Sequence, residues 1–150
     1  MTKEEIKEFS LRIADSSKTE LVVITYDIII NYIDGAIKAY EEEELENVVF
    51  NLQKAKQFVN NLSSCLDLNV GISHELLRIY IYVNNCLVKD IVKRNPANGE
   101  NVKRIISKLR NSYNEISPLD HSGKVMKNSE QVYVGYTYGR TSTLNEVVVR

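Results

Sequence analysis

The stretch ELVVITYDIIINYIDGAI, residues 20–37, decides the fold of this chain. Half of its residues are Val, Ile or Thr, which favour strands. On a helix, however, Asp27, Asn31, Asp34 and Lys38 fall in one narrow stripe, because they step by four, three and four residues. A strand would scatter them over both faces, and a membrane span would hold each aspartate in the bilayer at a cost of about 2.5 kcal/mol or more. The stretch is therefore predicted to form a helix.

The start of this helix is marked by Ser17 and, three residues later, Glu20. In a Ser-x-x-Glu pair each side chain bonds a backbone amide that the first helical turn leaves without a partner. We expect the helix to end at the acidic run 41–44, which is more typical of a solvated helix end than of a cation site.

Three more helices follow from the spacing of apolar residues. In residues 45–66, apolar side chains recur at steps of three and four. Residues 74–95 are apolar over more than half of the helix circumference. In residues 102–116, apolar side chains recur at steps of four and three. Ser73 is a candidate N-cap of the middle helix. Four helices of about 20 residues joined by short turns pack as antiparallel neighbours. The predicted fold class is all-α, an antiparallel four-helix bundle with a short N-terminal helical cap and a flexible C-terminal tail.

The two ends of the chain differ from the bundle in composition. In the N-terminal part, Ile6, Phe9 and Ile13 would form an amphipathic turn too short to be stable alone. The C-terminal part is rich in Gly, Ser, Thr and Tyr, and its segment QVYVGYTYG alternates like a short strand. We expect this tail to be mobile, to dock along a groove or to pair with another copy. The expected organisation is a cap segment at 1–16, a bundle at 17–117 and the tail at 118–150.

Charge and cysteine content narrow the function classes. With 19 basic and 20 acidic side chains the net charge is -1, so no overall field attracts nucleic acid or an anionic membrane. The N-terminus lacks the apolar core of a secretory signal, and we expect a cytoplasmic protein without membrane insertion. Cys65 and Cys86 stand among apolar residues and are predicted to be buried thiols, with a disulfide or metal pair as the alternative.

Groups suited to catalysis are few. The two histidines, His74 and His121, fit solvated positions, and neither is paired with a ligand at metal-binding spacing. The Glu-x-x-His motif of di-metal bundles, the Gly-rich phosphate loop and the Gly-x-Ser-x-Gly nucleophile turn are all absent from the sequence. We therefore expect no enzyme, no metal site and no cofactor.

The first long helix carries more apolar surface than a peripheral helix needs, because only about 100° of its circumference is polar. One interpretation is that it lies centrally, flanked by the other helices. The other is that an edge around Tyr26, Ile30, Ile33 and Ile37 lines a groove for an amphipathic partner helix.

Several segments together resemble a known family. The run SSKTELVVITYD resembles the Ser/Thr-Pro-x-x-Leu-(apolar)-Tyr-Asp-Gly opening of flagellar secretion chaperones of the FliS type. The segment GISHELLRIYIYVNNCLVKDIVKRN is similar to the third helix of that family, and SYNEIS is similar to the end of its fourth helix. The resemblance covers about residues 17–117. The sequence departs from the family pattern at Lys18, where Pro is usual, and at Ile28, where Gly is usual.

The resemblance implies a cytoplasmic chaperone that binds the C-terminal helices of flagellin, prevents premature polymerisation and delivers the subunit to a flagellar export gate component. It also implies an N-terminal lid over the client groove, formed here by Ile6, Phe9 and Ile13. The client-binding residues expected are Tyr26, Asp27, Ile30, Ile33, Ile37, Tyr80, Tyr82 and Leu87. The alternative is a helical adaptor or dimerisation module, which would form a homodimer through the same surface.

Overall fold

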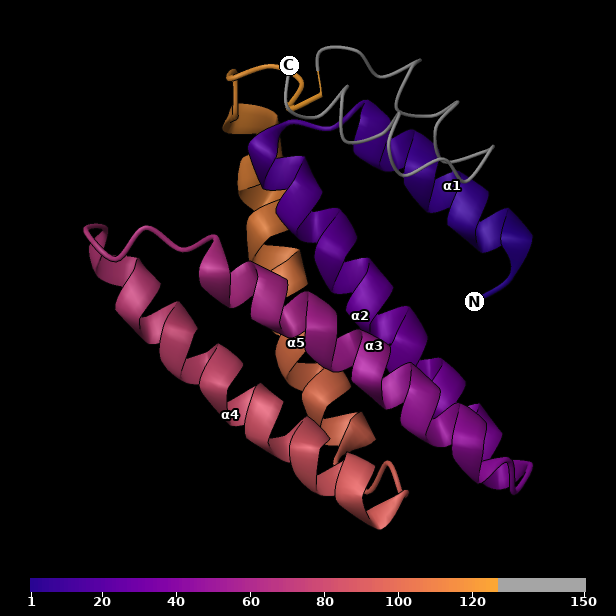
Figure 1. Cartoon of the computed structure of the whole chain (residues 1–150). Helices are drawn as coiled ribbons and strands as arrows, with labels where there is room; N and C mark the ends of the chain where they lie inside the picture. Colours follow the sequence, from indigo (N-terminus) through magenta and orange to yellow (C-terminus); the bar gives the residue numbers. More distant parts are fainter. Residues whose placement is uncertain (127–150) are drawn as a thin grey trace. The chain divides into compact units, whose positions relative to one another are not determined.

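The computed structural model of the chain describes residues 1–126, and every regular element among them is helical (Figure 1). The predicted all-α class is therefore confirmed, and the helix predicted from the stretch 20–37 is α2. The segment QVYVGYTYG lies outside the described residues. In chain order the elements are α1 (Lys3–Ala14), α2 (Lys18–Glu41), α3 (Leu45–Ser64), α4 (Gly71–Lys93), α5 (Gly99–Ile116) and the 3₁₀-helix η1 (Ser117–Leu119).

The chain forms two compact units. The larger unit is Thr25–Arg110, which contains most of α2, all of α3 and α4, and most of α5. The smaller unit combines Met1–Ile24 with the chain from Asn111 onward, of which the structure describes the part up to residue 126.

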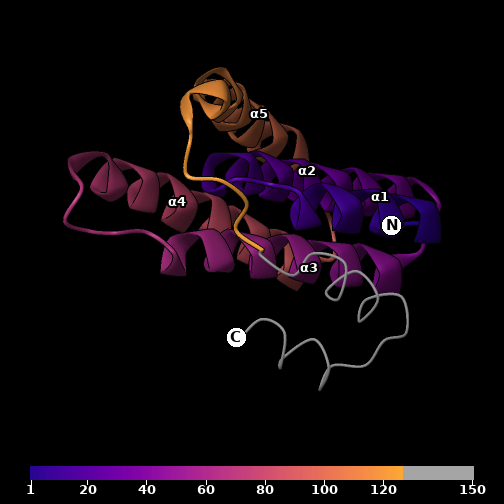
Figure 2. The ribbon, with the colours of Figure 1, turned by 90° about the horizontal axis from the view of Figure 1, so that it is seen from above.

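Within the larger unit, successive helices run antiparallel and form the predicted four-helix bundle (Figure 1). Helix α3 packs against α4, and the two lie side by side in both views (Figure 1, Figure 2). Every helix of the bundle contributes completely buried apolar side chains, so the burial of apolar surface stabilises the unit. These include Ile29, Ile33, Val48, Leu52, Val59, Val83, Leu87, Val102 and Ile106.

Gly35 of α2 lies directly against a polar side chain of α3. A Cβ atom placed at Gly35 would be 2.7 Å from Oδ1 of Asn51, closer than real Cβ atoms approach. Asn51 is buried, and its Nδ2 donates a hydrogen bond of 2.7 Å to the backbone oxygen of Asn47. The missing side chain at residue 35 thus leaves the space that the Asn51 amide occupies.

The turn between α4 and α5 is built around Asp90, which is only 1% exposed. Its carboxylate accepts hydrogen bonds from the backbone N–H of Asn98 at 3.0 Å and from Nδ2 of Asn98 at 2.7 Å. Burial raises the pKa of Asp90, against the opposing effects of the two Asn98 bonds and of Lys93. Arg94 then reverses the chain in the left-handed region with φ 52°. Asp90 therefore stabilises the turn that returns the chain along α5.

In the smaller unit, the short N-terminal helical cap predicted for residues 1–16 is α1, a helix of 12 residues. A reciprocal pair of hydrogen bonds caps its start: Glu5 N–H donates to Thr2 Oγ1, and Thr2 N–H donates to Glu5 Oε2. This capping box satisfies amide groups that would otherwise lack partners and so favours a helix that is marginal by length alone.

The segment after η1 returns to the junction between α1 and α2. One carboxylate oxygen of Asp120 accepts hydrogen bonds from Thr19 N–H at 3.0 Å and from Thr19 Oγ1 at 2.8 Å. Val125 N–H donates to the backbone oxygen of Ser16 at 2.9 Å, and Lys124 forms an ion pair with Asp15. We call residues 120–125 the polar clasp, because they hold the beginning of α2 through hydrogen bonds and charge.

Three local predictions need correction or completion. Ser17 Oγ does accept a hydrogen bond from Glu20 N–H, but the preceding amide, Thr19 N–H, is bonded by Asp120 of the polar clasp. Ser73 is buried inside the first turn of α4, which begins at Gly71 without a side-chain cap. Cys86 is buried as predicted, whereas Cys65 is exposed because α3 ends just before it; both thiols are free.

Candidate functional site

Four of the eight predicted client-binding side chains belong to the core. Tyr26, Ile33 and Leu87 are 0% exposed and Tyr80 is 2% exposed. The expectation that these four lie on an open apolar edge is wrong, because their side chains are buried. The other four are accessible: Asp27, Ile30 and Ile37 are half-buried and Tyr82 is exposed.

The two buried tyrosines satisfy each other. The hydroxyl groups of Tyr26 on α2 and Tyr80 on α4 form a hydrogen bond of 2.5 Å. A buried phenol needs a polar partner, and here α2 and α4 supply one to each other. The pair thus fixes the relation between two helices of the bundle and exposes no surface.

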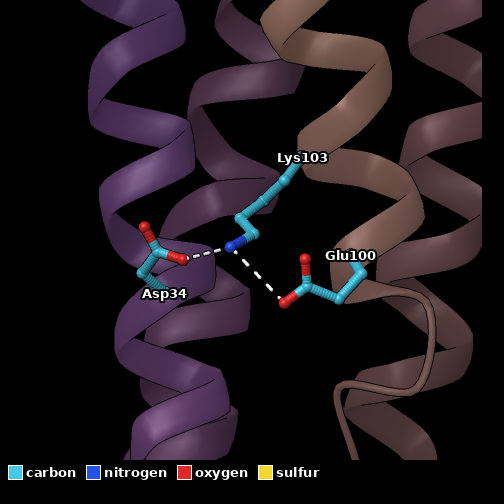
Figure 3. Close-up of polar contacts among 3 residues, drawn as sticks. All are labelled: Asp34, Glu100 and Lys103. Atoms are coloured by element: carbon cyan, nitrogen blue, oxygen red, sulfur yellow. Dashed lines mark hydrogen bonds and ion pairs between the residues drawn. The ribbon is translucent and has the colours of Figure 1, made fainter.

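The polar stripe that identified α2 as a helix faces basic residues of α5. Asp27 Oδ1 accepts from Nε of Arg110 at 2.9 Å, and Asp34 Oδ1 contacts Nζ of Lys103 at 2.5 Å. Lys103 also lies 3.5 Å from Oε1 of Glu100, so its ammonium is placed between two carboxylates (Figure 3). The hydrogen bond to Asp34 is the main cause that raises the pKa of Lys103. Asp27 and Asp34 therefore hold α2 against α5.

Tyr82 marks a different surface, on the outward side of α4. Its side chain is 50% exposed, and its hydroxyl accepts a hydrogen bond of 3.2 Å from Nδ2 of Asn101 on α5. Besides Ile72 in the first turn, three apolar side chains of the same helix are also exposed: Ile81, Val88 and Val92. We call these three residues the outer face of α4. The sequence indicated that this helix has exposed apolar residues, since it is apolar over more than half of its circumference. Val92 was nevertheless not among the predicted client-binding residues.

The predicted lid residues all lie on α1. Ile6 is 47% exposed, whereas Phe9 and Ile13 are half-buried. The guanidinium of Arg12 lies 5.5 Å from the centre of the Phe9 ring, a favourable cation–π arrangement. The helix thus keeps two apolar side chains, Ile6 and Leu11, in solvent, while the charged group of Arg12 covers part of the Phe9 ring.

The smaller unit contains a shallow hollow of about 260 Å³ with a mixed lining. Its polar residues include Arg12, Asp15 and Glu20, with no histidine or cysteine that could serve as a nucleophile or base. Nowhere in residues 1–126 do His, Cys, Asp and Glu side chains gather in a group suited to a metal ion. None of the helices in this range is long and apolar enough to traverse a lipid bilayer.

Comparison with protein families identifies the chain. The profile of the family described as flagellar protein FliS matches residues 4–134, which is most of the sequence. The chain belongs to the flagellar protein FliS family. The resemblance inferred from the motifs is thereby confirmed, and FliS membership gives the protein the general role of a flagellar chaperone. A search of curated proteins found no match.

Proposed function

We propose that this FliS-family protein is a flagellin-specific export chaperone. It would bind the C-terminal helices of flagellin in the cytoplasm, prevent premature polymerisation and deliver the subunit to a component of the flagellar export gate. The observation that carries the proposal is the family match over residues 4–134. The exposed apolar side chains of α4 support it, because a chaperone of this kind must offer apolar surface to its client.

The proposed mechanism is that of a holdase and requires no nucleotide, cofactor or catalytic residue. Client helices that are disordered in the monomer would fold against accessible apolar side chains and hide the surface that drives filament assembly. Tyr82, Ile30 and Ile37 are the proposed direct contacts, with Asp27 at their edge. The buried residues Tyr26, Ile33, Tyr80 and Leu87 would act by shaping the helices that carry these contacts.

The proposal also assigns a lid role to α1. Client binding would displace Ile6, Phe9 and Ile13, and the half-buried state of Phe9 and Ile13 means that some apolar contact must be exchanged. Hydrogen exchange of α1 should therefore become faster on addition of client. Unchanged or slower exchange in a formed complex would contradict the lid role while leaving client binding intact.

Client binding can be tested with a C-terminal flagellin fragment and size-exclusion chromatography coupled to light scattering. We expect a 1:1 complex, and weaker binding by Tyr82→Ala, which removes an exposed ring without entering the core. Tyr40→Ala is the matched control, because Tyr40 is 42% exposed at the end of α2. The absence of any complex at micromolar concentrations would overturn the proposal. A homodimer without flagellin binding would favour the alternative, a dimerisation module.

A further inference from the structure

The turn between α4 and α5 contains Asn98 followed by Gly99, the only Asn-Gly pair in the sequence. An asparagine before glycine is chemically labile, because glycine has no Cβ to hinder the approach of its nitrogen to the side-chain amide. Attack of that backbone nitrogen on Cγ of Asn98 closes a succinimide ring and breaks the Cγ–Nδ2 bond. Ammonia leaves, its third proton balancing the one lost by the backbone nitrogen, and water then opens the ring to an aspartyl or isoaspartyl residue. The pair is therefore a candidate site of spontaneous deamidation.

The packing of the bundle favours a glycine at residue 99. Gly99 is buried at the start of α5, and a Cβ atom placed there would lie 3.2 Å from Cδ1 and 3.3 Å from Cγ1 of Ile37 on α2. Both distances are shorter than an ordinary van der Waals contact. A side chain at residue 99 would slow the closure of the succinimide ring, but it would also crowd α2. The labile pair therefore needs protection of another kind.

Hydrogen bonds hold both reacting groups in the folded protein. Asn98 Nδ2, the nitrogen that would leave, donates to Oδ1 of Asp90 at 2.7 Å, and Asn98 N–H donates to Oδ2 at 3.0 Å. The attacking nitrogen, that of Gly99, donates to the backbone oxygen of Pro96 at 2.9 Å. Asp90 is 1% exposed, so water does not replace these bonds readily. The side chain of Asn98 therefore cannot turn toward the nitrogen of Gly99 without the loss of a buried hydrogen bond.

We infer that Asn98 is a conditional deamidation site, which Asp90 keeps intact while the turn between α4 and α5 is closed and which reacts in molecules whose turn has opened. The reaction is one-way, and its product opposes reclosure. A carboxylate at residue 98 faces the buried carboxylate of Asp90 where the amide donated a hydrogen bond, and like charges repel. An isoaspartyl residue also lengthens the backbone by one methylene next to Gly99. The inference does not depend on the proposed chaperone role.

Peptide mapping by mass spectrometry during incubation of the full-length protein in mildly alkaline buffer measures the reaction. Trypsin releases residues 95–103, in which Asn95 and Asn101 are internal controls, because the first precedes a proline without N–H and the second a β-branched valine. Conversion should occur at Asn98 and should be slower by about tenfold or more in the folded protein than in a synthetic peptide of residues 95–103. Equal rates in protein and peptide, or equal conversion of the three asparagines, would overturn the inference.

Substitution of Asp90 separates local protection from overall stability. Asp90→Ala should accelerate the conversion of Asn98 about tenfold, because the acceptor of both bonds is lost. Asp90→Asn keeps one acceptor oxygen and should give an intermediate rate. Leu52→Ala is the matched control, since it opens a cavity in the core on α3 and leaves the bonds of Asn98 in place, so its rate should stay close to that of the unaltered protein. An unchanged rate in Asp90→Ala, or equal acceleration in Leu52→Ala, would overturn the inference, because unfolding of the whole protein would then explain the reaction.

The effect of the product can be measured directly. Asn98→Asp places the product carboxylate beside Asp90 and should lower the midpoint of denaturant unfolding. Asn101→Asp is the matched control, because it adds the same charge to the first turns of α5 away from Asp90. Equal midpoints in the two variants would overturn the conclusion that deamidation at Asn98 opposes reclosure of the turn.

Discussion

The two units of this protein are stabilised by different interactions. In the larger unit, buried aliphatic side chains from all four helices of the bundle form the core. In the smaller unit the buried apolar residues are only Ala14, Val23 and Ile24 within the described part, and Ser10, Ser16 and Ser17 are buried too. Hydrogen bonds and charges of the polar clasp supplement this small core. Since apolar burial is insensitive to pH and salt whereas exposed charges are not, the smaller unit should open first.

The largest effect is expected from a cavity in the bundle. Leu52→Ala removes a side chain that is 0% exposed on α3 and should lower the free energy of unfolding by about 2 to 5 kcal/mol. Denaturant unfolding followed by circular dichroism measures the change. Leu45→Ala, at a position 43% exposed on the same helix, should stay within about 0.5 kcal/mol. Equal losses in the two variants would mean that the core assignment is incorrect.

A smaller loss is expected at the turn between α4 and α5. Asp90→Ala leaves two donors of Asn98 without their acceptor and should cost about 1 to 3 kcal/mol. Burial raises the pKa of Asp90 in the folded state, so ionisation of the buried carboxyl opposes folding: the folded state is favoured most at acid pH, and its stability decreases as pH rises through the folded pKa. Asp90→Asn should flatten the dependence of stability on pH above about 4. An unchanged pH profile in Asp90→Asn would contradict the assignment.

Loss of the Asp120 carboxylate should affect only the part of the chain that the polar clasp contacts. Asp120→Ala removes the acceptor of Thr19 N–H and should accelerate amide hydrogen exchange at the start of α2 while leaving the exchange of α3 unchanged. Hydrogen bonds from Ser122 and Thr19 lower the pKa of Asp120, so the stability that its carboxylate contributes is complete above the ordinary carboxyl pKa of about 4 and is lost as pH falls from there through the lowered folded pKa. Faster exchange throughout α3 in this variant would contradict the separate stability of the units.

The smallest effect is expected at the ion pairs between α2 and α5. Asp34 is 54% exposed, so Lys103→Met should change the free energy of unfolding by no more than about 0.5 kcal/mol. The pKa of Lys103 is raised, so its contribution is present below about pH 10.4 and is lost as pH rises beyond the folded value. A thermal unfolding series in low and high salt measures it. A loss comparable to that of Leu52→Ala would show that charge matters far more in the larger unit than described.

The sequence predicted the elements well because each depends on local spacing. The stripe through Asp27 and Asp34 correctly identified α2 as a helix, although its contact with Arg110 and Lys103 of α5 could not be read from α2 alone. The candidate site was predicted less well. Periodicity shows which residues are apolar, but whether Tyr26 is covered depends on the neighbouring helices.

A capping box and a long-range hydrogen bond show what local sequence patterns can and cannot predict. The Thr-x-x-Glu pattern of Thr2 and Glu5 stands in the sequence but was not among the predictions, and its capping box makes α1 longer than the apolar residues alone suggested. The bond between Thr19 and Asp120 was not visible, because no local pattern links residues that are 101 positions apart. Prediction from sequence therefore succeeded within helices and failed where distant segments meet.

The polar clasp has a consequence for the order of events during synthesis. The acceptor for Thr19 N–H is translated 101 residues later, which at about 5 to 20 residues per second is a delay of roughly 5 to 20 seconds. Throughout that interval α2 can form, but its first turn lacks the carboxylate that completes it. The nascent chain therefore acquires its finished N-terminal junction only when most of the protein has left the ribosome.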